Sequence, residues 1–156
     1  KQQKKNNPKR RPIKPRRRKR IKNENTGGSM INAKFTGNRK INIEAKGFNI
    51  PVDLAKTEGG DGSAPNPFTL LMAALLSCSA YHVLLLVERL GMNKEDFHVE
   101  LEPGLDANGD MQKALIKVFV PADFPKEREA AMKASVMGCK VGRHLKAERT
   151  VEIIRG

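Results

Sequence analysis

Short segments that alternate apolar and polar residues stand on both sides of one long apolar segment. Ile31–Phe35 and Ile41–Glu44 alternate in this way around residues 36–38, which predicts a β-hairpin with its turn at those residues. Phe48–Val52 predicts a third short strand, and a loop with three glycines follows at residues 58–65. The first part of the fold is therefore expected to consist of strands.

Residues 66–91 carry the signals of a long helix. Asn66 is a preferred N-cap, Pro67 is favoured at the first helical position, and Gly91 is a typical helix end. No charged residue occurs from Phe68 to Val87. A helix that is apolar on all sides must be buried by a sheet or by a partner chain, and in a domain this small the pattern favours a dimer that shares its core.

The apolar segment is also long enough to cross a bilayer. Polar residues in its middle argue against this, because polar groups are costly in lipid. They are Ser77, Cys78, Ser79, Tyr81 and His82. The flanking strands also require a soluble core, so we expect a buried core helix and no membrane association.

The C-terminal half predicts further elements of both kinds. In chain order they are strands at Phe97–Leu101 and Ala114–Val120 around a turn at Asn108-Gly109, an amphipathic helix at Pro125–Met137, a short helix at Val141–Ala147, and a closing strand at Val151–Ile154. The order β-β-β-α-β-β-α-α-β predicts an α+β domain over residues 30–156.

The basic charge of the chain is concentrated at its start. The net charge is +13, but residues 1–29 hold 13 of the 30 basic residues and only one of the 17 acidic residues. This segment has three prolines and no periodic apolar pattern, so it is predicted to be a disordered tail. The remainder is nearly neutral and gives no charge argument for a DNA-binding domain.

Three interpretations of the basic tail stay open. Its clusters would bind any polyanion without sequence preference, because they have no aromatic side chain to stack on a base. The tail could also be a localisation signal. The Gly27-Gly28-Ser29-Met30 junction favours a third interpretation, a vector-derived extension in front of a natural start at Met30.

Two cysteines are the main candidates for chemistry. Two are too few for a secreted disulfide framework, and no CxxC or clustered His indicates a metal site. We therefore expect a cytoplasmic protein with reduced thiols. Cys78 lies among small residues of the long helix, a setting in which a cysteine is more often an inert core residue.

The sequence around Cys78 resembles a known signature. Residues 59–78 read GGDGSAPNPFTLLMAALLSC, and Cys139 follows 61 residues after Cys78 in the segment GCKVGRHL. A glycine-rich loop, an Asn-Pro pair, a Leu/Ala-rich helix and two widely spaced cysteines resemble the OsmC/Ohr family. This family joins osmotically inducible protein C and the organic hydroperoxide resistance proteins.

The resemblance implies a fold and an activity. The fold is an intertwined homodimer in which antiparallel sheets wrap around long central helices, with active sites at the subunit interface. The activity is that of a thiol peroxidase for organic hydroperoxides that needs no cofactor. Cys78 would become a sulfenic acid, Cys139 would condense with it to a disulfide, and a lipoyl-type dithiol would reduce the disulfide.

The resemblance also implies supporting residues. Arg39 and Glu58 stand where the family keeps an arginine and a glutamate. A guanidinium near the thiol favours the reactive thiolate, and a carboxylate can hold the guanidinium in place. Lys40 or Lys56 could supply the cationic group instead.

Several residues depart from the family pattern or stay open. Lys140 follows the second cysteine where the family has proline, which indicates an OsmC-like branch rather than Ohr proper. His82, one turn after Cys78, could tune the thiolate or be a satisfied core histidine. Arg143, four residues after Cys139, could favour a thiolate at Cys139 or be solvated.

Two functions from other classes compete with the peroxidase. The apolar surface around Cys78 could form a pocket for a small hydrophobic ligand in a non-catalytic module. Alternatively, the domain could be a scaffold that the basic tail localises to nucleic acid.

Overall fold

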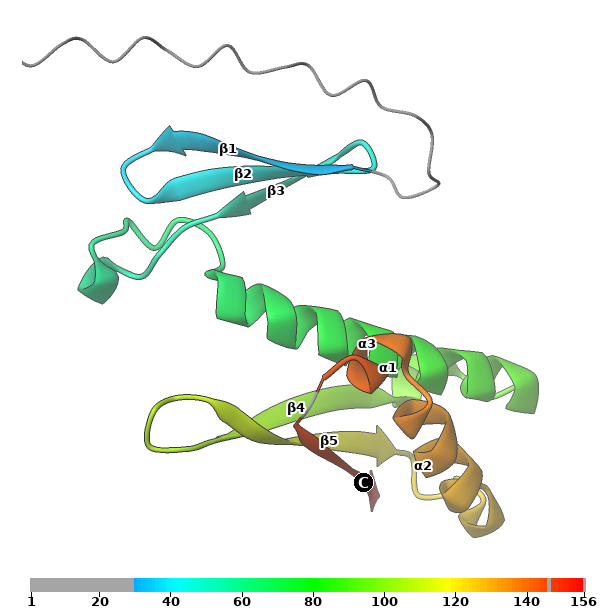
Figure 1. Ribbon diagram of the computed structural model, residues 1–156. Coiled ribbons are helices and arrows are strands. Elements are labelled where there is room, and N and C mark those ends of the chain that lie inside the picture. Colours follow the sequence, from blue (N-terminus) through cyan, green and yellow to red (C-terminus); the bar gives the residue numbers. More distant parts are fainter. Residues whose placement is uncertain (1–29, 146, 156) are drawn as a thin grey trace, which may run out of the picture.

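The computed structural model describes residues 30–145 and 147–155, and the predicted basic tail at residues 1–29 lies outside them. Two three-stranded sheets are joined by a long helix, α1 (Pro67–Leu90) (Figure 1). The strands are β1 (Ile31–Gly37), β2 (Lys40–Ala45) and β3 (Phe48–Val52) in the first sheet, and β4 (His98–Leu105), β5 (Met111–Val120) and β6 (Glu148–Arg155) in the second. The α+β class and the order of the major elements are as predicted.

The first sheet is antiparallel, and its first turn lies later than predicted. Strand β1 continues through Gly37, which pairs with Lys40 across a two-residue turn. An irregularity in the pairing after Phe35 shifts the register. Asn38, with a φ of +30°, and Arg39 therefore form the turn. This difference places Arg39 at the tip of the hairpin.

The second sheet corrects the expectation that the sheets are entirely antiparallel. Strands β4 and β5 are antiparallel, but β6 runs parallel to β5. A parallel neighbour requires a crossover connection. The chain makes this crossover through the 3₁₀ turn η3 (Lys126–Arg128), α2 (Glu129–Met137) and α3 (Lys140–Arg143).

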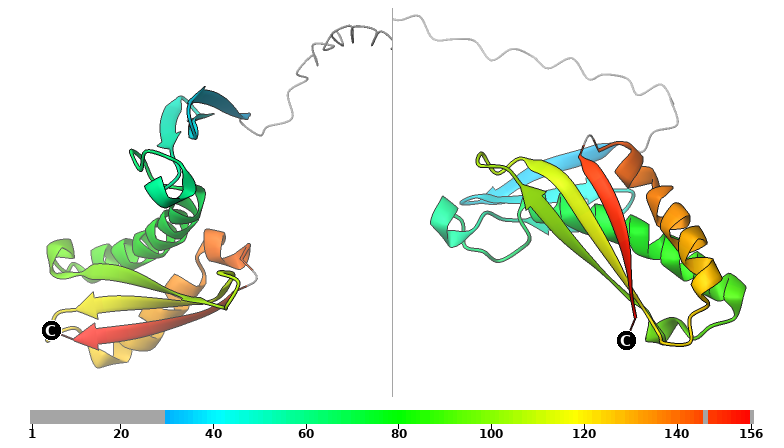
Figure 2. Two further views of the ribbon diagram at one scale, coloured as in Figure 1. Left: turned by 90° about the vertical axis from the view of Figure 1, so that its left-hand side faces the viewer. Right: turned by 90° about the horizontal axis from the view of Figure 1, so that it is seen from below.

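The predicted ends of the long helix are confirmed. Asn66 Oδ1 accepts a hydrogen bond from the Thr69 backbone N–H at 2.8 Å, Pro67 occupies the first turn, and Gly91 ends the helix with a φ of +67°. The C-terminal half of α1 packs beside α2 on the second sheet (Figure 2). The core residues come from α1, β5, α2 and the loop before η3. They are Val83, Val87, Ile116, Val118, Val120, Phe124, Met132 and Val136.

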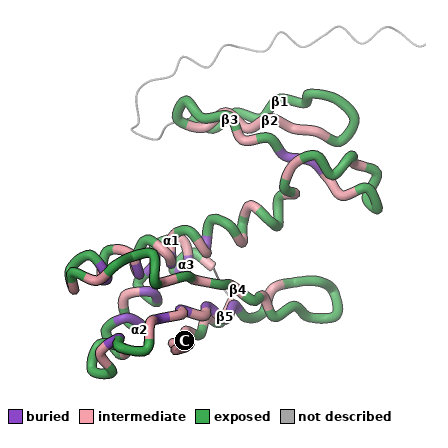
Figure 3. Tube along the Cα trace, turned by 180° about the vertical axis from the view of Figure 1, so that it is seen from behind, coloured by how far each residue is buried: buried purple, intermediate pink, exposed green. Residues whose placement is uncertain are grey.

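One face of α1 stays open in the single chain, so the predicted burial of this helix on all sides would require a partner chain. Its buried residues are Leu75, Ser79, Val83 and Val87, whereas Phe68, Leu71, Tyr81 and Leu85 are exposed. The first sheet projects from the start of α1 and is mostly exposed (Figure 3). By length and composition α1 could cross a membrane, but its buried face packs on the second sheet as a core helix does.

Candidate active site

The first cysteine lies halfway along α1, where the helix leaves the second sheet's core. Cys78 is half-buried and follows one turn after Leu75, which is fully buried. The neighbouring Ser79 turns its hydroxyl back to the Leu75 carbonyl at 2.9 Å. The helix therefore satisfies its own buried polar group, and the Cys78 thiol is left to contact other segments.

The second cysteine forms the link between α2 and α3. Gly138 caps the end of helix α2, and Cys139 is the N-cap of α3, with a φ of −49° and a ψ of 126°. Its Sγ accepts a hydrogen bond from the Gly142 N–H at 3.3 Å, which is the role that a Ser or Asn oxygen usually has at this position. The side chain of Cys139 is fully buried.

The tertiary structure brings the two cysteines together. Cys139 and Leu75 belong to one buried cluster with Ala114, and Cys78 packs against it. The Cys139 thiol is one of the groups that lower the pKa of the Cys78 thiol. Both are free thiols.

The surroundings of Cys78 favour its thiolate. Burial raises the pKa of the Cys78 thiol, but the backbone N–H groups of Val141 and Lys140, the Cys139 thiol and the positive charge of Arg143 together lower it further than burial raises it. The resulting pKa lies below the usual value of a thiol. These N–H groups are the unpaired donors of the first turn of α3. The charge of Arg143 thus favours a thiolate at Cys78, whereas the sequence suggested such an effect at Cys139.

A second arginine supports the Cys139 turn and was not found from the sequence. Arg149 of β6 donates through Nη1 to the Met137 carbonyl at 3.2 Å. Its guanidinium lies directly over Gly142, where a Cβ atom would collide with it. The glycine between Val141 and Arg143 was the only signal of this close approach in the sequence.

His82 faces α2. Ser135 Oγ lies 3.4 Å from His82 Nδ1 and donates to the His82 carbonyl at 3.3 Å. A Cβ atom on Gly138 would lie 3.9 Å from the ring. The contacts favour the interpretation of His82 as a packed histidine that joins α1 to α2.

Arg39 and Glu58 lie together at the other end of α1. A Cβ atom on Gly59 would lie 3.0 Å from Arg39 Nε, so the guanidinium lies against the residue that follows Glu58. Glu58 ends the 3₁₀ turn η1 (Lys56–Glu58), and its Oε2 accepts from the Ala55 N–H at 3.3 Å. The structure thus groups Arg39 with Glu58, and Cys78 with Cys139.

The two groups are separated along α1 within one chain. Arg39 and Pro67 line the same cavity of about 250 Å³, together with apolar residues that include Phe35 and Ile41. Cys78 lies eleven residues further along the helix than Pro67, which corresponds to about 16 Å along its axis. Lys40, the other candidate cation beside Arg39, is paired with Asp61 at 2.8 Å.

No metal site accompanies the thiols in the part of the chain that the structure describes, since no three His, Cys, Asp or Glu side chains there are placed to share an ion. The chemistry that the geometry offers is that of a half-buried thiolate beside a second thiol. A thiolate of lowered pKa is a nucleophile, and a neighbouring thiol can trap its oxidised form.

Comparison with solved structures shows the same architecture in proteins of low sequence identity. A Psychrobacter arcticus protein assigned to osmotic stress and detoxification responses is 14% identical, with a TM-score of 0.68 over 88% of this chain and 99% of its own. An OsmC-like protein from Mycoplasma pneumoniae is 12% identical, with a TM-score of 0.63 over 83% and 99%. An organic hydroperoxide resistance protein, OsmC, from Legionella pneumophila is 17% identical, with a TM-score of 0.56 over 85% and 99%.

The fold and the paired thiols define an α+β thiol protein with two sheets around a central helix. The family model described as OsmC-like protein matches residues 60–154, and the chain belongs to this family. No curated protein sequence matches the chain. Solved neighbours at these identities share the fold, and their family includes proteins of organic hydroperoxide resistance.

Proposed function

We propose that the protein is a two-cysteine peroxidase that reduces organic hydroperoxides. The observation that carries the proposal is the packing of Cys78 against the buried cluster that contains Cys139, where the pKa of the Cys78 thiol is lowered. A buried cysteine that served only for packing would have a raised pKa. The chain belongs to the OsmC-like family, and organic hydroperoxide resistance proteins share its fold, which supports the same chemistry.

The reaction follows from these two thiols. The Cys78 thiolate attacks the outer oxygen of the hydroperoxide, the O–O bond breaks, and the alkoxide leaves as an alcohol after it takes up a proton. Cys78 is then a sulfenic acid. The Cys139 thiolate attacks the sulfenic sulfur, the disulfide forms, and water leaves.

A dithiol completes the cycle. A thiolate of the reductant attacks the disulfide to give a mixed disulfide, and its second thiol closes the reductant's own disulfide and releases both cysteines. We propose a lipoyl-type dithiol for this step. This reductant needs access to only one sulfur of the disulfide, and Cys78 is the more exposed of the two cysteines.

A second copy of the chain would complete the site. Large apolar side chains are exposed on the open face of α1 and on the first sheet, among them Tyr81 at 66% and Phe35 at 88%. Exposed apolar surface of this extent marks an interface. An isologous dimer around α1 would cover it and could bring Arg39 and Glu58 of one subunit to the cysteines of the other. Arg39 would then bind the peroxide oxygens, with Glu58 positioning it.

The proposal is tested by mass spectrometry of the reduced protein before and after one equivalent of cumene hydroperoxide. We expect loss of both free thiols and a Cys78–Cys139 disulfide in the tryptic peptides. The Cys139→Ser variant should instead carry a sulfenic acid on Cys78 that dimedone traps. Two thiols that survive the peroxide would contradict the proposal and leave ligand binding by the apolar cavity as the function to test.

A further inference from the structure

Asp53 is a buried carboxylate that hydrogen-bond donors of the following loop surround. It follows β3 directly, and only 1% of its surface is exposed. Its two oxygens accept hydrogen bonds from the Ser63 N–H at 2.9 Å, the Ser63 hydroxyl at 2.8 Å and the Asp61 N–H at 3.3 and 3.4 Å. A buried charge is tolerated only when such donors satisfy it. Asp53 therefore fixes residues 61–63 to the end of the first sheet.

The loop between β3 and α1 is closed tightly around this carboxylate. The Asp53 N–H donates to the Pro65 carbonyl at 3.3 Å, and the Gly62 N–H donates to the Leu54 carbonyl at 3.0 Å. A Cβ atom on Gly60 would collide with the Leu54 carbonyl oxygen and would lie 2.9 Å from Asp53 Oδ1. Glu58 lies within this loop, so the position of its backbone depends on the closure around Asp53.

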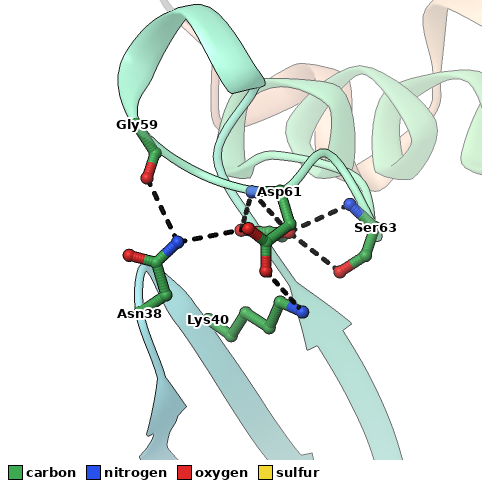
Figure 4. Close-up of polar contacts among 6 residues, drawn as sticks. Asn38, Lys40, Gly59, Asp61 and Ser63 are labelled. Carbon is green, nitrogen blue, oxygen red and sulfur yellow. Dashed lines mark hydrogen bonds and ion pairs between the residues drawn. The ribbon is translucent and has the colours of Figure 1, made fainter.

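The same loop is tied to the hairpin that carries Arg39 (Figure 4). Asn38 Nδ2 donates to the Gly59 carbonyl and to Asp61 Oδ1, both at 3.3 Å, and Lys40 Nζ pairs with Asp61 Oδ2 at 2.8 Å. Both sequence neighbours of Arg39 thus bind the loop, and Arg39 lies against Gly59. The links from Asn38 and Lys40 are exposed, and such contacts position little by themselves.

We propose that Asp53 is the positioning residue that holds Arg39 and Glu58 in register with each other. The buried carboxylate holds the Asp61 backbone, Asp61 binds both sequence neighbours of Arg39, and the Arg39 guanidinium lies against Gly59 of the same loop. The proposal rests on the proposed function, because it assigns Arg39 and Glu58 a role at the thiols. Small misplacements of a group that orients a reactant cost large factors in rate.

The test uses the full chain and the Asp53→Asn variant. The variant keeps the size of the side chain but turns an NH₂ group toward backbone donors, so the loop must shift. The matched control is Asp123→Asn, which changes an exposed carboxyl outside this loop. The rate of Cys78 oxidation by cumene hydroperoxide is measured by stopped flow, and the rate of its alkylation by iodoacetamide is measured in parallel.

We expect peroxide oxidation to slow by about tenfold or more in Asp53→Asn, while alkylation, which needs no oriented guanidinium, stays within about twofold. The Nε–H signal of Arg39 in ¹⁵N NMR should shift or broaden in this variant and stay unchanged in Asp123→Asn. A purely structural role would slow both reactions alike or neither. An unchanged peroxide rate with an unchanged Arg39 signal would overturn the proposal.

A milder variant covers the case in which Asp53→Asn does not fold. Ser63→Ala removes only the hydroxyl hydrogen bond and should slow peroxide oxidation by roughly threefold, with a smaller shift of the Arg39 signal. An Arg39 signal and a peroxide rate equal to those of the wild type would overturn the proposal. If the wild type itself does not react with peroxide, the proposed function fails, and the Arg39 signal alone still tests the positioning role.

Discussion

Cys78 packs against the buried cluster that contains Cys139, although 61 residues separate the two cysteines in the sequence. The contact forms because α2 packs beside the second half of α1, and the chain then turns back over the helix at Cys139. The short helix α3 begins at this turn and directs its first N–H groups at Cys78. The arrangement joins a thiol of lowered pKa, the groups that lower this pKa and a second thiol.

The charge of Arg143 should be visible in the pH dependence of Cys78. The pKa of the thiol is lowered, so its reactivity rises with pH through a value below that of a free cysteine. Arg143→Gln should move this rise to higher pH and slow alkylation at neutral pH by roughly two- to fivefold. The measurement is the iodoacetamide rate against pH, with Lys133→Gln as the control, and coincident profiles for wild type and Arg143→Gln would contradict the assignment.

The open face of α1 should control the oligomeric state. Leu85 is 48% exposed in the single chain, and an apolar side chain there is covered only if a second subunit packs on it. Leu85→Glu should convert a dimer to a monomer, because a carboxylate in that interface would be unpaired. Light scattering after size exclusion measures the mass, with the exposed Glu88→Gln as the control. A wild-type monomer would rule out the shared site.

The contact between Gly142 and Arg149 predicts a coupled pair of substitutions. Gly142→Ala should lower the unfolding free energy by about 1–3 kcal/mol, because the new methyl group displaces the guanidinium from its place over the turn. Removing the arginine as well, in Gly142→Ala/Arg149→Ala, should cost less than the sum of the two single changes. Urea unfolding of the four proteins gives this coupling, and additive losses would show that the two residues do not interact.

The aliphatic core should depend on a few fully buried side chains. Ile116 is 0% exposed between α1 and α2, and Ile116→Ala should cost about 2–5 kcal/mol of unfolding free energy through lost burial and a cavity. Leu105→Ala, at a side chain that is 50% exposed, should cost much less. Chemical denaturation measures the unfolding free energy of both variants. Equal losses would mean that Leu105 is covered in the assembled protein.

Acid should release the loop around Asp53. Hydrogen bonds lower the pKa of Asp53, and the one from the Ser63 N–H has the largest effect. Together they outweigh burial, which raises this pKa. Because this pKa is lower in the folded protein, the ionised Asp53 stabilises the fold at every pH above the pKa of an unfolded Asp, roughly pH 4. As the pH falls below this value and through the pKa of the folded protein, the stabilisation is lost. Amide exchange at Asp61 and Ser63 should therefore accelerate in acid.

Two variants distinguish the protonation of Asp53 from other effects of acid on amide exchange. Asp53→Asn should expose the Asp61 and Ser63 amides at all pH values and remove their acid dependence. Asp106→Asn is the matched control, because the pKa of Asp106 is lowered in the same way by the Asp110 N–H in the turn between β4 and β5. It should affect only the amides of its own turn. Acid dependence that persists at Asp61 in Asp53→Asn would contradict the assignment.

Local signals in the sequence determined the helix ends and the candidate thiols. Asn66, Pro67 and Gly91 act through hydrogen bonds and backbone angles within a few residues of themselves, so the bounds of α1 could be predicted. The motif around Cys78 and the spacing to Cys139 predicted the family. These features depend on neighbouring residues or on a pattern that the chain itself displays.

The tertiary structure decided what depends on packing between distant segments. The parallel pairing of β6 with β5, the burial of only one face of α1 and the place of Arg149 over Gly142 follow from how the crossover packs. No alternation of residues records a strand's direction or its partner. The same packing decides that the charge of Arg143 lowers the pKa of Cys78 and that Asp53 closes its loop, because burial and charge act across space and not along the chain.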